Sequence, residues 1–480
     1  MKKYLSLLLF IGAFTHATSL FAQPCDRETA ALVAHNFLER HNNGYAVDAV
    51  EEFSHHDQNL AWIAHLQPQG FVLISASRNM RPVLAYSFES RWHTGGTEFE
   101  TFTMLLRKDL SLRLQHAGGL PEVPQEIAGE WQSYLTGSQP ARFEQWPPEG
   151  TTPTGGWLFT NWTQSAPYNL MCPIDGNTHQ RSYAGCPAVA MAQVLNCLME
   201  IKAVQFSDDD DYYHNYAGNH FWIDDDWQDH GFPAFDSLNL YLDTIQNNYL
   251  EQKPLNNLQK AALTFACGTA LKQVYSSSVS GTWGIEQAID AYQRFGFEES
   301  RLVYDSDTSL CADLAENIKN GWPAHLGLVD PGGTVGHNVV VDGYNTDEFY
   351  HFNFGWGGSS NGWYTMPPTS APYNLTVIEG IVMDIKGINP HVGVPASASK
   401  PDGKIKYHPQ LNEVSVMSSS PVHDPVLKVY DIHGRLMYSL EPQHVDGTTC
   451  RFSLPRIHRQ ILLITALDGR LIVAKEKIMP

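Results

Sequence analysis

The stretch Ala184–Met199, AGCPAVAMAQVLNCLM, decides the fold of the central part of this chain. Pro187 follows Cys186, and proline is favoured in the first turn of a helix because its missing N–H has no partner to lose there. The next residues are apolar on nearly every side, as in a helix buried inside a domain. We therefore predict a buried helix that begins at Cys186. Its free N–H groups would favour a thiolate, although Cys186 as a small core residue, like Cys197, is the simpler alternative.

A second stretch, Gly336–Gly358 (GHNVVVDGYNTDEFYHFNFGWGG), predicts a β-hairpin. One strand runs over Val339–Val341 with His337 at its entry, and Phe349–Phe354 is the returning strand. This pairing would bring His337 close to Asn353. A cysteine nucleophile needs a histidine base and a third group that fixes the imidazole, and an amide suits an imidazole that must carry charge.

Two further residues fit the same chemistry. The Trp356 indole would shield the histidine from water. Gln164, in the loop Asn161–Leu170 (NWTQSAPYNL), carries an amide that would form an oxyanion hole together with the Cys186 N–H. Taken alone, a glutamine in a polar loop is most often solvated. With 21 histidines in the chain, His337 is singled out only by its neighbours. Three other histidines are interpreted as surface or packing residues: His214, His325 and His351.

These three segments, in this order, resemble the streptopain family of papain-fold cysteine peptidases. The matching residues are Gln164 with Ala166–Asn169, Gly185-Cys186 with Ala188 and Ala190–Gln193, and Gly336-His337, Asp342-Gly343, Tyr350-His351, Asn353 and Gly355–Gly358. The resemblance covers roughly residues 160–390. The chain departs from the family at Pro187, where valine is common, and at Phe354, where tryptophan is common. Neither change removes a catalytic group.

The resemblance implies a role for each matching side chain. Cys186 would be the nucleophile, His337 its base, Gln164 an oxyanion donor and Asn353 a support for the histidine. The implied substrate-binding residues are Trp356, Phe354 and Gly336, with Ser280 and Gly281 of the loop Tyr275–Gly284 on the rim of the cleft. No metal or organic cofactor is needed for this chemistry.

The 480 residues suggest about three domains. Lys2, Lys3 and the apolar run Tyr4–Phe14 have the layout of a secretory signal peptide. We expect an α+β protein in which a papain-like domain, with the cysteine on a buried helix and the histidine on an antiparallel sheet, follows an α+β propeptide and precedes a small C-terminal β-sandwich. The predicted parts are a signal peptide (1–22), an inhibitory propeptide (23–140), a linker (141–156), the catalytic domain (157–390), a second linker (391–404) and a β sorting domain (405–480).

Local patterns define the flanking parts. Glu28–Arg40 reads as a helix, Gly70–Ser75 as a strand and Pro82–Ser87 as an edge strand. The stretch Gln139–Gly156 is dense in proline, glycine and threonine and is expected to be exposed and cleavable. Residues 23–140 resemble the streptopain propeptide. Residues 405–480 resemble, more weakly, the C-terminal sorting domain of the type IX secretion system, through Val429-Tyr430-Asp431 and Gly434-Arg435.

Charge and composition exclude several classes of partner. The net charge is −20 and no basic run is interleaved with aromatics, which argues against nucleic acid and anionic membranes. After the signal peptide, no apolar run is long enough to span a membrane. The acidic clusters Asp208–Asp211 and Asp224–Asp226 do not have the spacing of an EF-hand, so solvated loops are favoured over a calcium site.

The sequence thus predicts a secreted or cell-surface cysteine endopeptidase made as a zymogen. Its partners would be protein or peptide substrates, its own propeptide as inhibitor and the type IX secretion machinery. Two alternatives stay open: a catalytically silent surface protein that uses the papain-like scaffold for binding, and an acyltransferase that uses the same dyad.

Overall fold

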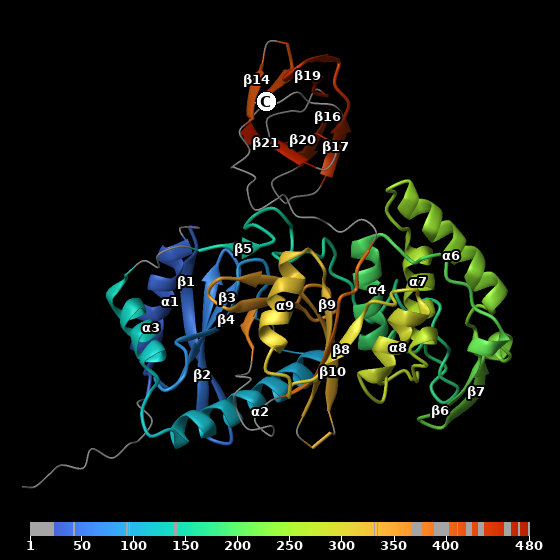
Figure 1. Cartoon of the computed structure of the whole chain (residues 1–480), viewed down its shortest axis with the longest axis horizontal. Coiled ribbons are helices and arrows are strands. Elements are labelled where there is room, and N and C mark those ends of the chain that lie inside the picture. The colour runs from blue at the N-terminus through green and yellow to red at the C-terminus, as the bar shows by residue number, and fades with distance from the viewer. Residues whose placement is uncertain are drawn as a thin grey trace, which may run out of the picture.

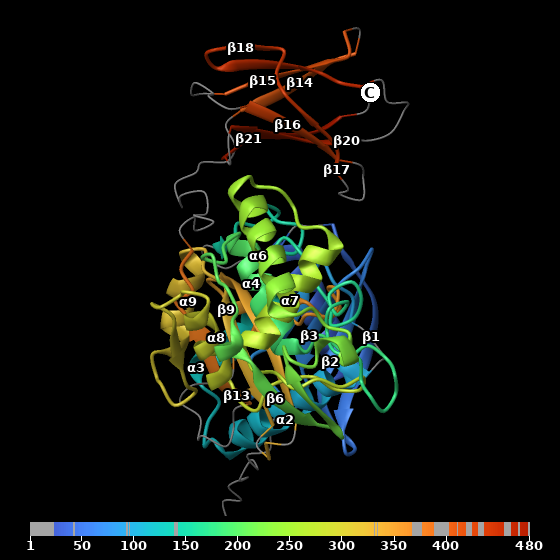
Figure 2. The ribbon, with the colours of Figure 1, turned by 90° about the vertical axis from the view of Figure 1, so that its right-hand side faces the viewer.

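A computed structural model describes residues 24–41, 44–92, 95, 97–138, 143–330, 332–333, 335–366, 377–387, 403–409, 411–418, 425–430, 436–455, 462–468 and 471–478. The predicted signal peptide lies outside these residues, as does most of the predicted second linker. The N-terminal and central parts share one large sheet, and the C-terminal strands form separate small sheets (Figure 1; Figure 2).

The N-terminal part is a sheet covered by helices. Its elements are α1 (Arg27–His41), β1 (Ala46–His55), β2 (Gln58–Gln67), β3 (Phe71–Ser75), β4 (Val83–Ser87), α2 (Thr97–Gly119) and α3 (Gln125–Thr136). The predicted helix and strands are therefore present. Helix α1 buries a stripe that includes Val33, Ala34, Phe37 and Leu38, because these positions recur on one side at helical spacing.

The prediction that Pro82–Ser87 is an edge strand is wrong. All five residues of β4 are buried. The strand pairs with β3 on one side and with β12 (Gly362–Thr365) on the other, where Tyr86 faces Trp363 and Ala85 faces Tyr364. Pro82 lies just before the strand, so its missing N–H does not interrupt the ladder. Strand β4 therefore joins the N-terminal part to the central part.

The central part completes an 11-stranded sheet in which every pairing is antiparallel. The order is β1-β2-β3-β4-β12-β11-β10-β9-β13-β8, and β5 pairs with β10 off this path. Its further strands are β5 (Gln145–Trp146), β8 (Arg301–Val303), β9 (Ala324–Val329), β10 (Gly336–Asn345), β11 (Phe349–Asn353) and β13 (Ile378–Met383). Strands β10 and β11 form the predicted hairpin.

Helices lie beside this half of the sheet (Figure 1). They are α4 (Cys186–Leu198), α5 (Trp227–His230), α6 (Phe235–Leu250), α7 (Asn257–Ala270), α8 (Glu286–Arg294) and α9 (Leu310–Lys319), with a separate hairpin of β6 (Tyr212–Tyr216) and β7 (Asn219–Ile223). Helix α4 packs between α7 and β10, and most of its residues are buried. The predicted class is confirmed: an α+β fold with the cysteine on a buried helix and the histidine on an antiparallel sheet.

Helix α4 begins at Cys186 because the chain turns sharply before it. Gly185 has φ 81°, a conformation that L side chains rarely adopt. A Cβ at this position would also overlap the amide of the buried Gln273. Glycine is thus required immediately before the cysteine for two independent reasons.

The stretch Gln139–Gly156 is less exposed than its composition predicts. Strand β5 pairs with the end of β10, at Tyr344 and Asn345, and Thr154 and Gly156 are buried. Gly156 lies directly against the Asp342 carboxylate, where a Cβ would overlap it. Much of the predicted linker is therefore attached to the central domain.

The C-terminal part has two four-stranded sheets, ordered β14-β15-β19-β18 and β17-β16-β20-β21. Their strands are β14 (Lys404–His408), β15 (Glu413–Met417), β16 (Pro425–Tyr430), β17 (Leu436–Leu440), β18 (His444–Asp446), β19 (Thr449–Ser453), β20 (Leu462–Asp468) and β21 (Leu471–Ile478). One buried cluster, including Val414, Val429 and Phe452, joins the two sheets. In the part of the chain that the structure describes, no helix has the length and apolar character needed to cross a membrane.

Candidate active site

Cys186 and His337 come together where the start of α4 meets the start of β10. The Cys186 Sγ accepts a hydrogen bond from the backbone N–H of Asn338 at 3.4 Å, and Asn338 directly follows His337. Cys186 is partly exposed and is the first residue of α4. Helix N–H groups and the Asn338 N–H therefore both favour negative charge on this sulfur.

His337 lies in an aromatic wall. Its ring stacks on Trp356, with centroids 4.6 Å apart, and on Phe354 at 6.3 Å. The side chain is only 3% exposed. Burial lowers the pKa of His337 to about 4, while its hydrogen bond to the Phe354 backbone acts in the opposite direction. The imidazole is therefore neutral over most of the pH range in this covered state.

The partner of His337 differs from the predicted one. Its Nε2 lies 2.9 Å from the Phe354 carbonyl oxygen, and a carbonyl only accepts, so this nitrogen carries the proton and Nδ1 the lone pair. The Asn353 side chain instead bonds to Gln193, Gly355 and residues 160–161. The expected support of His337 by Asn353 is therefore not a direct hydrogen bond here, because these partners occupy the amide.

Gln164 lies beside the start of α4, as an oxyanion donor must. Its backbone carbonyl accepts a hydrogen bond from the Ala184 N–H at 2.8 Å, two residues before Cys186. The residue is 9% exposed. The backbone bond thus holds the two predicted oxyanion-hole residues in neighbouring segments.

The loop Tyr275–Gly284 also lies next to the cysteine segment. The Tyr183 N–H donates to the Ser276 carbonyl at 3.1 Å, and the Gln273 amide donates to the Ala184 carbonyl at 2.8 Å. Gly281 opens onto free space, since a Cβ there would meet nothing within 4 Å. This agrees with a place on the rim.

Ser280, the other predicted rim residue, has a different place. It is 6% exposed, and its hydroxyl bonds to the Ser276 backbone N–H and carbonyl. Its side chain therefore builds the loop. The exposed hydrophobic side chains of the loop are Val279 and Trp283.

The other three histidines are packing residues, and all are fully buried. His214 accepts a hydrogen bond from the Tyr275 N–H at 2.8 Å. His325 contacts the Asn338 side-chain oxygen at 2.8 Å, and burial lowers its pKa to about 4. His351 pairs with Asp342 at 2.6 Å. His337 differs from all three in that the residue directly after it, Asn338, donates its backbone N–H to the Cys186 Sγ.

The N-terminal part covers the aromatic wall. Phe102 of α2 packs on Phe354, with ring centroids 4.5 Å apart, and on Trp356 at 5.7 Å. The Ser90 hydroxyl donates to the Gly358 carbonyl at 2.6 Å. Phe354 and Trp356 are therefore buried, at 1% and 7% exposure, whereas Gly336 is exposed. Binding of substrate by the two aromatic residues stays a prediction for a form that has lost this cover.

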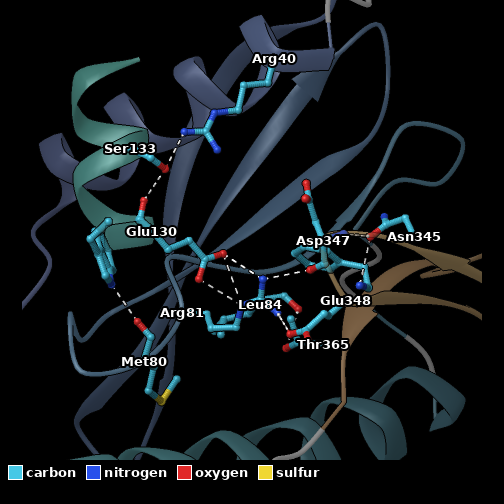
Figure 3. A network of polar contacts seen from close by, with 12 residues as sticks. Arg40, Met80, Arg81, Leu84, Glu130, Ser133, Asn345, Asp347, Glu348 and Thr365 are labelled. Atoms are coloured by element: carbon cyan, nitrogen blue, oxygen red, sulfur yellow. Dashed lines mark hydrogen bonds and ion pairs between the residues drawn. The ribbon is translucent and has the colours of Figure 1, made fainter. Parts of the chain in front are cut away.

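Arg81 makes a second contact between the two parts (Figure 3). Its guanidinium pairs with Glu130 of α3 at 2.9 Å and with Glu348 at 3.2 Å, and it donates to the Asp347 carbonyl at 2.9 Å. Asp347 and Glu348 form the turn between β10, which carries His337, and β11. One cation thus connects two elements of the N-terminal part to the histidine hairpin.

Sequence reasoning missed four contributors to the site: the Asn338 N–H, the Phe354 carbonyl, Gln193 and Gln273. The first two act through backbone atoms, and the identity of a residue does not reveal what its backbone atoms contact. Gln193 and Asn196 were visible as the two amide positions of an otherwise apolar helix, and a buried amide requires hydrogen-bond partners.

Comparisons with known proteins relate two parts of this chain to known families. Residues 162–364 match the model of the Peptidase C10 family, and residues 22–109 match that of the Spi protease inhibitor. The thiol protease/hemagglutinin PrtT of Porphyromonas gingivalis is 23% identical over 381 residues, which are 72% of this chain and 39% of PrtT. Streptopain of Streptococcus pyogenes is 23% identical over 335 residues, which are 64% of this chain and 73% of streptopain.

Two solved structures are also similar. The Prevotella intermedia prointerpain A fragment aligns over 71% of this chain and 99% of its own, with a TM-score of 0.49 and 19% identity. Active interpain A aligns over 48% and 94%, with a TM-score of 0.37 and 22% identity. Residues 162–364 are thus similar to the Peptidase C10 family, and they follow a segment, residues 22–109, that is similar to the Spi protease inhibitor.

Proposed function

We propose that the chain is a secreted cysteine endopeptidase, made as a zymogen, that hydrolyses peptide bonds through an acyl-enzyme on Cys186. The observation that carries the proposal is the contact of the Cys186 Sγ with the Asn338 N–H at 3.4 Å. This contact supports the proposal, because Cys186 begins helix α4 and Asn338 directly follows His337, the proposed base.

In the proposed reaction, the Cys186 thiolate attacks the scissile carbonyl carbon. The Cys186 N–H and the Gln164 amide stabilise the oxyanion that forms. His337, protonated in the ion pair, gives its proton to the leaving amine as the carbon–nitrogen bond breaks. Water, deprotonated by His337, then attacks the thioester and releases the acyl group. Gly336, Gly281, Phe354 and Trp356 are proposed to contact substrate.

Latency is proposed to arise from the N-terminal part. Phe102 covers the Phe354–Trp356 wall, and burial lowers the pKa of His337 to about 4. A neutral imidazole cannot form the ion pair with a thiolate. Removing the cover would admit water and raise that pKa, and would open the wall to substrate.

The C-terminal β module is proposed to act in export, with the type IX machinery as its partner. A chain truncated near residue 400 should accumulate as folded protein in the periplasm of a host with that system. Normal delivery of the truncated chain to the surface or medium would refute the sorting role.

Maturation tests the function directly. The Cys186→Ala chain, expressed alone, should persist as the full precursor. The native chain should lose at least residues 23–140, besides the signal peptide, and gain thiol-dependent activity on a protein substrate. A native chain that matures but does not cleave peptide bonds in a substrate would contradict the proposal. Transfer of the acyl group from Cys186 to an amine instead of water would favour an acyltransferase.

A further inference from the structure

The peptide unit between Phe354 and Gly355 is held at both ends. Its carbonyl accepts the hydrogen bond from His337 Nε2 at 2.9 Å, and its N–H, on Gly355, donates to the Asn353 Oδ1 at 3.1 Å. A peptide unit is planar. The contact at the N–H therefore fixes the direction in which the carbonyl points at His337.

The Asn353 amide is in turn held from several sides. Its Oδ1 accepts a hydrogen bond from Gln193 Nε2 at 3.2 Å, and its Nδ2 donates to the Thr160 carbonyl and to Asn161 Oδ1, both at 3.3 Å. Asn353 is 1% exposed and Gln193 is fully buried. Since water does not reach these groups, each lost bond would leave an unsatisfied buried amide, which is costly.

Gln193 connects this chain of contacts to the rest of the site. It lies seven residues after Cys186 on α4, about two turns along the same face of the helix. Its Oε1 accepts the Trp162 N–H at 2.9 Å, two residues before Gln164. The Trp162 carbonyl accepts the Gly357 N–H at 2.9 Å. Because the Trp162 N–H can only donate, Oε1 must face it, and Nε2 must face Asn353.

We propose that Gln193 is a positioning residue for the catalytic dyad, which orients His337 through Asn353 and the Phe354–Gly355 peptide unit and holds the Gln164 segment through Trp162. The inference rests on the proposed peptidase function. It gives the buried glutamine of the cysteine helix one task, namely to set the mutual geometry of nucleophile, base and oxyanion donor.

The alternative is that Gln193 only stabilises the fold, and Gln259 provides the matched control. Gln259 is also a buried glutamine on a helix of the same domain, 5% exposed, with two hydrogen bonds through its Oε1, to Asn248 and the Asn256 N–H. It caps α7 and is not part of the site. Replacing either glutamine by leucine removes a buried amide at similar volume.

The full chain carrying Gln193→Leu or Gln259→Leu would be processed by a trace of tagged native enzyme, which is then removed. We expect Gln193→Leu to lower kcat/KM about 10- to 100-fold, mainly through kcat. The basic limb of its pH profile should move to lower pH, because a misaligned carbonyl stabilises the imidazolium less well. Gln259→Leu should lower the resistance to unfolding by urea about as much as Gln193→Leu does. It should nevertheless keep the pH profile of the native enzyme.

Gln193→Glu separates the two halves of the relay. A carboxylate still accepts the Trp162 N–H but cannot donate to Asn353 Oδ1. This variant should therefore shift the basic limb as the leucine variant does, while losing less kcat. The pH dependence of Cys186 alkylation by iodoacetamide, read by mass spectrometry, gives the same comparison without any substrate.

The positioning role would be overturned if both Gln193 variants kept the native pH profile. It would also be overturned if Gln259→Leu shifted the basic limb as much as they do. If the native chain alkylates Cys186 rapidly but hydrolyses no peptide, the peptidase proposal fails, and the alkylation profiles still decide the role of Gln193.

Discussion

The backbone N–H of Asn338 lies 3.4 Å from the Cys186 Sγ, so the residue next to His337, the proposed base, contacts the proposed nucleophile. Cys186→Ala and His337→Ala should each abolish peptidase activity and leave the fold intact. The double variant should lose little more than either single one, because the two groups act as a unit. Hydrolysis of a fluorogenic peptide measures this, and activity retained in His337→Ala but lost in His325→Ala would reassign the base.

Gln164→Ala should lower kcat more than it raises KM. The expected loss in kcat is roughly 10- to 1,000-fold, by analogy with removal of one oxyanion donor in other enzymes. Steady-state kinetics on the mature enzyme separate the two constants. An effect on KM alone would mean that Gln164 binds substrate without stabilising the oxyanion.

Phe102→Ala should make the uncut precursor more reactive. Phe102 is 4% exposed and covers Phe354 and Trp356, so truncation uncovers the surroundings of His337. Iodoacetamide should alkylate Cys186 faster in this precursor than in the native one. The control is Phe37→Ala, since Phe37 is equally buried but its ring contacts lie within the N-terminal part. Equal acceleration in both would assign the effect to a general loosening of that part.

Arg81→Met should speed maturation of the precursor. The change removes the contacts of Arg81 with Glu348 and the Asp347 carbonyl, which connect the N-terminal part to the histidine hairpin. Arg40→Met is the matched control, because Arg40 donates a hydrogen bond to Ser133 within the N-terminal part (Figure 3). Its guanidinium also covers the ring of Tyr134. Gel analysis over time gives both rates, and indistinguishable rates would exclude a special role for Arg81.

His325 should make the precursor less stable in acid. Burial lowers its pKa to about 4 in the folded chain, against about 6.5 when unfolded. The unfolded chain therefore binds the extra proton as the pH falls from 6.5 to 4, and stability is lost over that window. The loss amounts to roughly 3 kcal/mol for a shift of this size.

Urea unfolding of the Cys186→Ala precursor at several pH values measures this loss. Adding His325→Gln should flatten the pH dependence by about 1.4 kcal/mol per pH unit within the window. An unchanged slope would show that His325 titrates normally in the folded chain.

The sequence allowed the cysteine helix, the histidine hairpin and the neighbourhood of Gln164 to be predicted, because each depends on local pattern. Pro187 marks the helix start, and the alternation around Val339–Val341 marks the strand. The partner of His337 was not predictable in this way. Asn353 and the Phe354 carbonyl are adjacent in the chain, and only the packing of Gln193 against Asn353 decides which of them meets the imidazole.

The edge-strand prediction failed for a related reason. Pro82 indicates where a strand begins but not which strand lies beside it. The partner of Tyr86 in β4 is Trp363, which lies 363 − 86 = 277 positions later in the chain. The composition of 139–156 likewise indicates an irregular chain without showing that Gly156 is needed against Asp342. The local sequence pattern does not reveal contacts of this kind, because the partners are far apart in the chain.

The pairing of β4 with β12 also bears on how the chain reaches its native state. A sheet that continues across the boundary makes the two parts one cooperative folding unit, whose non-local contacts must form before the catalytic half is complete. If the proposed maturation removes the N-terminal part, a mature chain that has unfolded must form β12 as an open edge without its neighbour β4. The mature chain would therefore be long-lived through a slow unfolding rate rather than through ready refolding, and each molecule would be folded only once.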